Sequence, residues 1–385
     1  MSDDGPSLER RPRPGRLKLA AFSAAVLLAV LVFVELGARW GLGARPLEAI
    51  AGNPYSATPL EMEWVLKPDF EGPWPLDPAL SVTIRTNSLG LRDDPIPPKP
   101  SGERRILFLG DSVVFGTRLA QHDTLPEQLE RRLGAGVRVI NAGVEGYSTF
   151  QQYHQLRHIG LGTEPDFILL GFVWNDVYEQ YRTMRRFGGD GNFMGLAHEQ
   201  MLAGAERWLF RSAAYTAAKL WWVKHRKRGR AGYAAAGLNY DVSEIFKDPP
   251  APHIAKAWDD TLAQLGALRD LAAEHHVPLL VVVFPYEMQF SPTLPDALVP
   301  NRRVRAFCRE HSIACYDLFD DFAAAPNRRE LFLPGDGTHL SAAGAGFVAG
   351  RLAALFEKAD LLEQTPDTVF NRLNDAIRDF SPPSK

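Results

Sequence analysis

Residues 106–112 read Ile-Leu-Phe-Leu-Gly-Asp-Ser, which is four apolar residues followed by a glycine, an aspartate and a serine. A short continuous apolar run is typical of a strand in a parallel sheet, because helices cover both faces of such a strand. The glycine permits a tight turn immediately after the strand. The stretch therefore predicts a buried strand whose carboxyl end places Ser112 on a sharp strand-to-helix turn.

Four further apolar runs follow, separated by segments with the spacing of helices. The predicted strands are 106–109, 137–140, 167–172, 279–284 and 313–317. The predicted helices are 125–133, 149–158, 254–275, 302–310 and 342–356. Alternation of strands and helices favours a parallel sheet with helices on both faces. We therefore predict an α/β protein with a three-layer α/β/α, flavodoxin-like parallel sheet of about five strands.

Two of these helices have recognisable start signals. The segment Thr124-Leu-Pro-Glu127 has the pattern of a capping box with a proline in the first turn. Ser341 is placed to cap the last core helix. In the tail after Pro366 we expect one amphipathic helix and then an irregular Ser-Pro-Pro-Ser-Lys end.

The N-terminus has the pattern of a membrane segment. Residues 1–18 are basic, and the uncharged run 19–34 follows them. This run is longer than the core of many signal peptides but shorter than the ~20 residues that span a bilayer. Glu35, at the end of the run, can reach the interface, and Trp40 suits an interfacial anchor. We expect an uncleaved single-pass signal-anchor helix over 19–40, with 1–18 in the cytoplasm, and keep a cleaved signal as the alternative.

Composition and cysteine content limit the classes of protein to which the chain could belong. The chain has 385 residues, 45% of them hydrophobic and 23% charged, as expected of a globular protein with a sizeable core. Its net charge of −3 gives no indication of a nucleic-acid partner. Two cysteines cannot supply a four-thiolate metal site, so Cys308 and Cys315 are expected to be buried thiols. A single disulfide is the alternative if the domain lies outside the cytoplasm.

The rest of the chain divides around the predicted sheet. Residues 41–103 are rich in proline, which opposes helices, and should form an irregular linker or flap. The main domain is expected at 104–358, with a partly helical insertion at 177–255 and a tail at 359–385. The insertion carries Trp208, Trp221, Trp222 and a basic run at 224–230. It could be a lid whose tryptophans stack on sugar or fill a small core, and its basic run could contact anionic lipid, an acidic glycan or solvent.

The candidate chemistry lies at the carboxyl ends of the predicted strands, the edge where open α/β sheets bind ligands. A serine needs an adjacent base to become a nucleophile, and His339 is the candidate base. Asp336, three residues earlier, can accept a hydrogen bond from the imidazole and fix its tautomer. Candidate donors to an oxyanion are the backbone N–H groups of Ser112 and Gly143 and the side-chain amide of Asn175.

These segments resemble the four blocks of the SGNH (GDSL-type) hydrolase superfamily, and particularly its membrane-anchored bacterial members. The blocks correspond to Ser112 in Gly-Asp-Ser, Gly143 in Asn-Ala-Gly, Asn175, and the pair Asp336 and His339. The resemblance covers roughly 104–356. One departure is Val173, which takes the position where the family usually has a glycine two residues before the asparagine. The segment Asn87-Ser-Leu-Gly-Leu-Arg92 matches one that often precedes the first block in anchored members.

The resemblance implies an SGNH-type serine hydrolase, a carboxylic ester hydrolase or O-acyltransferase, that needs no metal or cofactor. We expect it in the bacterial inner membrane, with the catalytic domain facing the periplasm or exterior. The leading hypothesis is removal or transfer of O-acetyl groups on a cell-envelope or exported polysaccharide. The alternatives are a lipid esterase or lysophospholipase, and a non-catalytic glycan-binding or assembly protein with the same fold. Acylated carbohydrate or lipid is therefore the expected substrate, and protein partners are open.

Overall fold

The computed structural model contains two units, which are described separately. One unit comprises Met1–Ile50 and Leu202–Leu238, and the other comprises Ala51–Met201 and Asn239–Lys385. The residues that the structure describes are 16–41, 54–57, 62, 64–74, 81–177, 212–215, 217–218, 242–294, 296–361 and 371–377. Trp208, Trp221, Trp222 and the basic run 224–230 of the insertion lie outside the described residues, as does most of the basic N-terminus.

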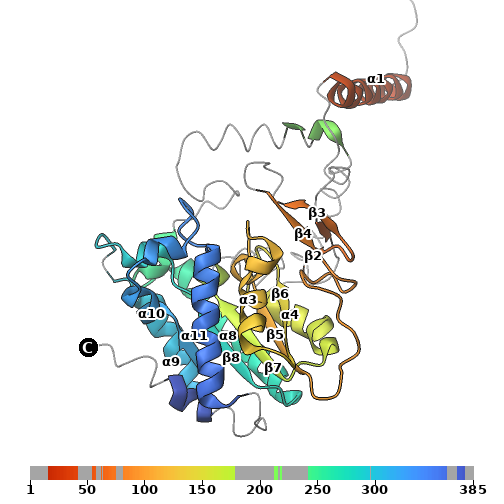
Figure 1. Cartoon of the computed structure of the whole chain (residues 1–385). Coiled ribbons are helices and arrows are strands. Elements are labelled where there is room, and N and C mark those ends of the chain that lie inside the picture. Colours follow the sequence, from red (N-terminus) through yellow and green to blue (C-terminus); the bar gives the residue numbers. More distant parts are fainter. Residues whose placement is uncertain are drawn as a thin grey trace, which may run out of the picture. The chain divides into compact units, whose positions relative to one another are not determined.

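A five-stranded parallel sheet forms the centre of the larger unit (Figure 1). Its strands are β5 (Arg104–Gly110), β6 (Val137–Gly143), β7 (Phe167–Phe172), β8 (Leu279–Val283) and β9 (Ala314–Asp317). Their order in the sheet is β6-β5-β7-β8-β9, and every adjacent pair is parallel. The predicted five-stranded parallel sheet is therefore confirmed. The predicted strands coincide with the observed ones apart from small differences at their ends.

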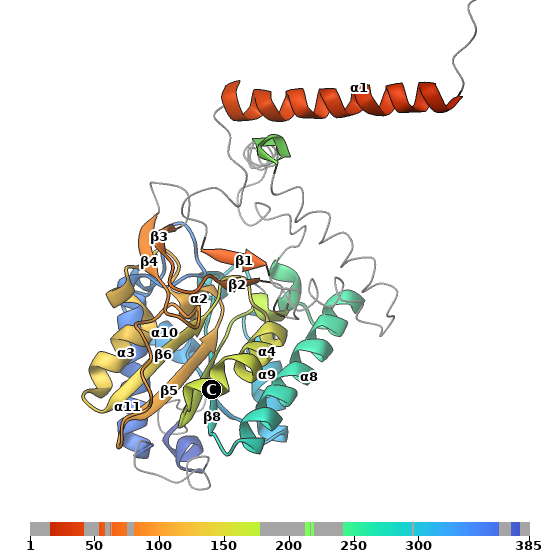
Figure 2. The same ribbon diagram turned by 90° about the vertical axis from the view of Figure 1, so that its right-hand side faces the viewer.

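Helices cover both faces of the sheet, which confirms the three-layer prediction (Figure 2). One face carries α3 (Leu125–Leu133) and α11 (Ala342–Ala359), which pack side by side. The other carries α4 (Thr149–His158), α8 (Pro252–Glu274) and α9 (Val299–Glu310), and α4 packs on α8. The short helices α2 (Ser112–Phe115) and α10 (Phe319–Ala324) follow β5 and β9. The two helix layers arise because the chain adds β6 on one side of β5 and β7 on the other.

The core consists of the strands and the helix faces that cover them. Residues 106–109 of β5 are fully buried, as the apolar run predicted, and so are the tryptophans Trp174 and Trp258. Cys308 is buried and Cys315 half-buried, and both are free thiols.

One of the two predicted helix caps is present. The Ser341 hydroxyl accepts a hydrogen bond from Gly344 N at the start of α11, as predicted. The predicted capping box at Thr124 is wrong, although α3 begins where expected. The Thr124 hydroxyl donates instead to the carbonyl of Gln121 in the preceding turn, so it does not cap α3.

The proline-rich segment before β5 forms two hairpins, where the sequence predicted irregular chain. They are β1 (Tyr55–Ala57) with β2 (Trp64–Leu66), and β3 (Glu71–Trp74) with β4 (Val82–Arg85). A two-stranded ribbon has free edges, so a proline such as Pro73 in β3 is tolerated there. Below we call these two ribbons the N-terminal hairpins.

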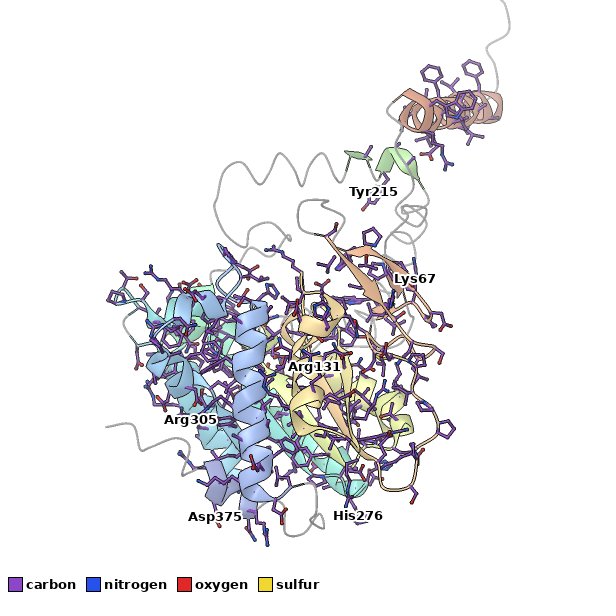
Figure 3. All side chains as sticks on the ribbon, viewed as in Figure 1. Lys67, Arg131, Tyr215, His276, Arg305 and Asp375 are labelled. Atoms are coloured by element: carbon purple, nitrogen blue, oxygen red, sulfur yellow. The ribbon has the colours of Figure 1, made fainter. Side chains whose placement is uncertain are left out.

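The N-terminal hairpins pack on the carboxyl edge of the sheet. Met62, Leu66 and Ile84 share a small apolar cluster with Phe115, Val144 and Tyr147, which follow β5 and β6. Figure 3 shows this placement, since Lys67 after β2 lies at the opposite end of the domain from His276, just before β8. The hairpins therefore contribute to the edge where the candidate site lies.

The Asn87–Arg92 segment connects the hairpins to the turn that follows Ser112. Arg92 is fully buried, and its guanidinium donates to the carbonyls of Phe115 and Gly116 at 2.8 Å and of Leu119 at 2.6 Å. The guanidinium also lies over the Phe115 ring, 4.7 Å from its centroid. The Asn87 side chain accepts from the backbone of Leu89 and Leu91, which shapes the loop that delivers Arg92. The structure thus gives this segment a role: it holds the end of α2.

The smaller unit contains the apolar N-terminal helix α1 (Arg16–Leu36). The stretch Ala20–Gly41 is 22 residues long and apolar enough to cross a membrane, and it fits a membrane anchor or a signal sequence. Glu35 accepts hydrogen bonds from Ser212 Oγ at 2.7 Å and from the N–H groups of Ala213 and Ala214 at 2.9 and 3.1 Å. The insertion therefore contacts this helix, and its described residues around Ala213 are helical, as predicted.

Arg92→Ala should strongly destabilise the larger unit. The change leaves the buried carbonyls of Phe115 and Leu119 without a donor, whereas Gly116 O keeps the backbone N–H of Leu119. At ~1–3 kcal/mol per unsatisfied group we expect a loss of at least about 2 kcal/mol in the free energy of unfolding. The measurement is denaturant unfolding of the full chain in detergent. Arg131→Ala is the matched control, because Arg131 is exposed and donates to a single carbonyl, that of His122. Equal stability of the two variants would contradict the role of Arg92.

Candidate active site

Ser112 is the first residue of α2, directly after the turn that ends β5. Gly110 ends the strand and packs closely on α2, since a Cβ there would lie 2.3 Å from Val114 Cγ2. Asp111 caps the short helix by accepting from Val113 N at 2.9 Å. The backbone N–H of Ser112 donates to no group in the part of the chain that the structure describes. This N–H is therefore available to a bound substrate oxygen.

Ser112, His339 and Asp336 form one hydrogen-bonded chain. The distance from Ser112 Oγ to His339 Nε2 is 2.8 Å, and that from His339 Nδ1 to Asp336 Oδ1 is also 2.8 Å. The histidine and the serine are 227 positions apart in the sequence, and only the fold brings them together. A hydroxyl bonded to an imidazole that is itself bonded to a carboxylate allows the imidazole to take the hydroxyl proton.

The Asp336 carboxylate is held by its own loop. Oδ1 also accepts from Thr338 Oγ1 at 2.6 Å and from His339 N at 3.0 Å. The adjacent residues Gly335 and Gly337 have φ values of 73° and 75°, a left-handed backbone that glycine adopts without strain. Arg118, on the loop after α2, approaches the second oxygen, with Nη1 3.6 Å from Oδ2. The carboxylate is thus fixed before any substrate binds.

The electrostatics of the pair favour a charged imidazole. Burial by itself would lower the pKa of His339, but the hydrogen bond and charge of Asp336, with the charges of Asp111 and Glu145, raise it above its ordinary value. Burial likewise opposes the charge on Asp336, but its hydrogen bonds and the charge of His339 hold its pKa well below the usual range. These interactions therefore favour the charged, imidazolium form of His339.

Asn175 lies beside the serine, on the turn after β7. Its Nδ2 donates to Asp111 Oδ2 at 2.8 Å, which uses one of the two amide hydrogens. Asp111 Oδ2 is also 3.2 Å from Ser112 Oγ. The second hydrogen of Nδ2 remains for a substrate oxygen. Val173, the departure from the family pattern, is buried, and its N–H donates to Asp176 Oδ2 at 2.9 Å.

Two buried carboxylates lie beneath this turn. Asp111 and Asp176 are 1% and 0% exposed. Burial raises the pKa of both carboxyls, and the negative charge of Asp111 raises that of Asp176 further. Asp176 accepts from Gln152 and Val173 at 3.1 and 2.9 Å. The burial of Asp176 beneath the site is a finding of the structure.

Gly143 is not placed as the sequence predicted. Its N–H already donates to the side chain of Asn141, with Gly143 N 3.0 Å from Asn141 Oδ1. A Cβ at this position would lie 2.1 Å from Phe115 N, so the absence of a side chain serves close packing beneath α2. Gly146, three residues later, is partly exposed with a φ of 77°. Its N–H donates to no other group among the residues that the structure describes.

Sequence reasoning also missed the aromatic side of the site. Trp64 of β2 and Trp74 of β3 are half-buried. Both are fixed by Glu145 in the loop after β6, because Trp74 Nε1 donates to its carboxylate at 2.6 Å and Trp64 Nε1 to its carbonyl at 3.2 Å. The same carboxylate accepts from Thr117, five residues after the serine. The only signal in the sequence was two tryptophans in a proline-rich stretch.

Comparison with solved structures finds distant similarity to several proteins. The solved structures with detectable similarity include the lipase/acylhydrolase from Enterococcus faecalis, which is 15% identical, covers 66% of this chain and 95% of its own, and gives a TM-score of 0.38. The acetyl xylan esterase AlAXEase is 15% identical, with 65% and 98% coverage and a TM-score of 0.39. TesA is 13% identical, with 71% and 99% coverage and a TM-score of 0.37.

No curated protein matches the chain. The profile of the GDSL-like lipase/acylhydrolase family, however, matches residues 108–346, from the strand before Ser112 to the helix after His339. That match covers more than half of the chain and includes the carboxyl ends of β5 to β9. The protein therefore belongs to the GDSL-like lipase/acylhydrolase family.

Proposed function

We propose that the protein is a serine esterase in which Ser112 is the nucleophile, His339 the general base and Asp336 the residue that orients it. The observation that carries this is the 2.8 Å contact between Ser112 Oγ and His339 Nε2. His339 takes the serine proton as Ser112 attacks the ester carbonyl, and then returns it to the leaving alcohol. Water, or a second alcohol, releases the acyl group from Ser112 by the same route.

The developing oxyanion needs donors that are not already occupied. The candidates are the N–H of Ser112, the second hydrogen of Asn175 Nδ2 and the N–H of Gly146. Gly146 replaces Gly143 in this role, because the Gly143 N–H is held by Asn141 at 3.0 Å. Removing one such donor from a serine enzyme typically lowers kcat by about 10²–10³-fold.

We propose that the substrate is a short acyl ester, such as O-acetyl, on a polysaccharide. Support comes from Trp64 and Trp74, whose indoles are anchored through their N–H groups on Glu145. An indole fixed by its N–H offers a rigid apolar surface at low entropic cost, which suits the C–H faces of sugar rings. Glu145 also contributes to the electrostatics of His339, so the residue that anchors both tryptophans lies near the proposed catalytic histidine.

We further propose that α1 tethers the domain to the bacterial inner membrane as an uncleaved single-pass anchor. The basic residues before the apolar stretch favour a cytoplasmic N-terminus, and the catalytic domain would then face the periplasm or exterior. An envelope or exported polysaccharide would be within reach of such a domain. Mass spectrometry of the N-terminal peptide in the membrane fraction distinguishes this anchor from a cleaved signal.

Ser112→Ala should abolish ester turnover. Without the hydroxyl no acyl-enzyme can form, so we expect hydrolysis of p-nitrophenyl acetate to fall by at least about 10³-fold. Ser101→Ala is the matched control, because Ser101 is exposed and precedes β5 at the opposite edge of the sheet. Wild-type turnover should also be faster with the acetate than with a long-chain ester. Equal rates for Ser112→Ala and wild type would exclude the esterase, and preference for the long chain would favour a lipid substrate.

Trp74→Phe should weaken polysaccharide binding selectively. Losing the indole N–H anchor and part of the ring face should raise KM for an O-acetylated polysaccharide about 2–10-fold, the scale of an aromatic contact. The same variant should hydrolyse p-nitrophenyl acetate at the wild-type rate, which serves as the internal control. Acetate release from the polysaccharide is the measurement. Parallel losses on both substrates would show that Trp74 supports the fold and not the sugar.

Activity should rise with pH through the pKa of His339. The base works only when neutral, and its pKa is raised, so the acid limb of kcat/KM should have its midpoint above the ordinary histidine value of about 6.5. Asp336→Asn removes the principal group that raises this pKa. The acid limb should therefore move to lower pH while kcat falls by about 10³–10⁴-fold. An acid limb that stays in place in Asp336→Asn would contradict the proposed pairing.

A further inference from the structure

The hydroxyl group of Tyr286 takes part in two hydrogen bonds with Asn175. Tyr286 lies three residues after β8, at the same carboxyl edge as Ser112, and is only 4% exposed. Its oxygen is 3.0 Å from the backbone nitrogen of Asn175 and 3.0 Å from Asn175 Oδ1. No sequence motif pointed to this residue.

The direction of these two hydrogen bonds follows from their chemistry. The backbone N–H of Asn175 can only donate, so the Tyr286 oxygen accepts from it. The single hydroxyl hydrogen of Tyr286 is then donated to Asn175 Oδ1. At the other end of the amide, Nδ2 donates to Asp111 Oδ2 at 2.8 Å. Both ends of the Asn175 side chain are therefore fixed.

This arrangement permits one orientation of the amide. A reversed amide would place Oδ1 against the Asp111 carboxylate, two acceptors in contact, and would turn the NH₂ group away from that carboxylate. In the observed orientation one Nδ2 hydrogen is used by Asp111 and the other remains for the substrate oxygen. Tyr286 disfavours the reversed amide, because its hydroxyl hydrogen can be accepted by Oδ1 but not by the NH₂ group.

Tyr286 is itself held by a buried polar network. Its backbone N–H donates to Gln289 Oε1 at 2.9 Å, and Trp174 Nε1 donates to the same oxygen at 2.6 Å. The amide of Gln289 then donates to Ala297 O at 2.7 Å and to Asn301 Oδ1 at 2.9 Å. A hydroxyl supported in this way holds its partner in place before the reaction, so no reorganisation is needed in the transition state.

We propose that Tyr286 is a positioning residue for oxyanion stabilisation: its hydroxyl fixes the Asn175 amide with Nδ2 directed to the reacting carbonyl oxygen. This inference rests on the proposed esterase function. Tyr286 does not touch the substrate in this scheme and acts only through Asn175. Its loss should therefore affect the transition state more than the binding of substrate.

The test is a double-mutant cycle of Tyr286→Phe and Asn175→Ala, assayed with p-nitrophenyl acetate. We expect Tyr286→Phe alone to lower kcat by about 10–100-fold, less than loss of a whole donor, with KM changed less than about two-fold. In the Asn175→Ala background the same change should lower kcat by less than about two-fold. The backbone N–H of residue 175 persists in both backgrounds, so the cycle isolates the side-chain amide.

Tyr316→Phe is the matched control. Tyr316 of β9 is also buried, and its hydroxyl donates to Asp321 at 2.8 Å and accepts from Arg351 at 3.3 Å, outside the site. This variant should keep the wild-type kcat. If Tyr286→Phe does not fold, 3,5-difluorotyrosine at position 286 retains the ring and the hydroxyl but loses its proton at lower pH. The fall of kcat on the basic side should then begin at lower pH, and an unchanged basic limb would overturn the proposal.

The outcomes separate the two proposals. If Ser112→Ala is as active as wild type, the esterase function is wrong and the role of Tyr286 with it. If Ser112→Ala is inactive but Tyr286→Phe keeps full kcat, only the positioning role is wrong. If Tyr286→Phe lowers kcat equally in the wild-type and Asn175→Ala backgrounds, the positioning role is also wrong, because the hydroxyl would then act on the fold and not through the amide.

Discussion

The site depends on the hydrogen bonds made by the buried carboxylate of Asp111. This carboxylate caps α2 through Val113 N, accepts the amide of Asn175 and lies 3.2 Å from the hydroxyl of Ser112. One buried group thus connects the turn after β5 to the turn after β7. Burying a carboxylate is costly, and here hydrogen bonds from its neighbours offset that cost in part. Its charge also favours a positive charge on His339.

Around this centre, the elements outside the parallel sheet hold the turn that carries the serine. Arg92 binds the carbonyls at the end of α2, and the N-terminal hairpins pack their apolar side chains against Phe115 and Val144. Glu145 joins the two tryptophans of these hairpins to Thr117. The hairpins are therefore a structural part of the edge that carries the candidate site. A family profile that begins at residue 108 does not include them.

Much of the fold could be predicted from local patterns. The apolar run at 106–109 and its successors indicated buried parallel strands because such strands are apolar on both faces. Ser112, Asn175, Asp336 and His339 could be identified because each follows a strand or lies in a short motif. The hairpins could not be predicted, because a proline-rich sequence shows no strand pattern and these short ribbons are stabilised by packing on the sheet. The prediction of a capping box at Thr124 was wrong because the Thr124 hydroxyl donates to a carbonyl in the preceding turn.

The sequence by itself determined the order of strands and helices along the chain, the serine at a strand end and the residues able to act as its base. It could do so because apolar periodicity and turn chemistry are local properties. Only the tertiary structure decided which donors and acceptors at the site already have a hydrogen-bond partner within the protein. The Gly143 N–H is bound to Asn141, the Asn175 amide is fixed between Asp111 and Tyr286, and Arg92 reaches the end of α2. Hydrogen-bond partners that are distant in sequence are set by packing, and no local pattern encodes them.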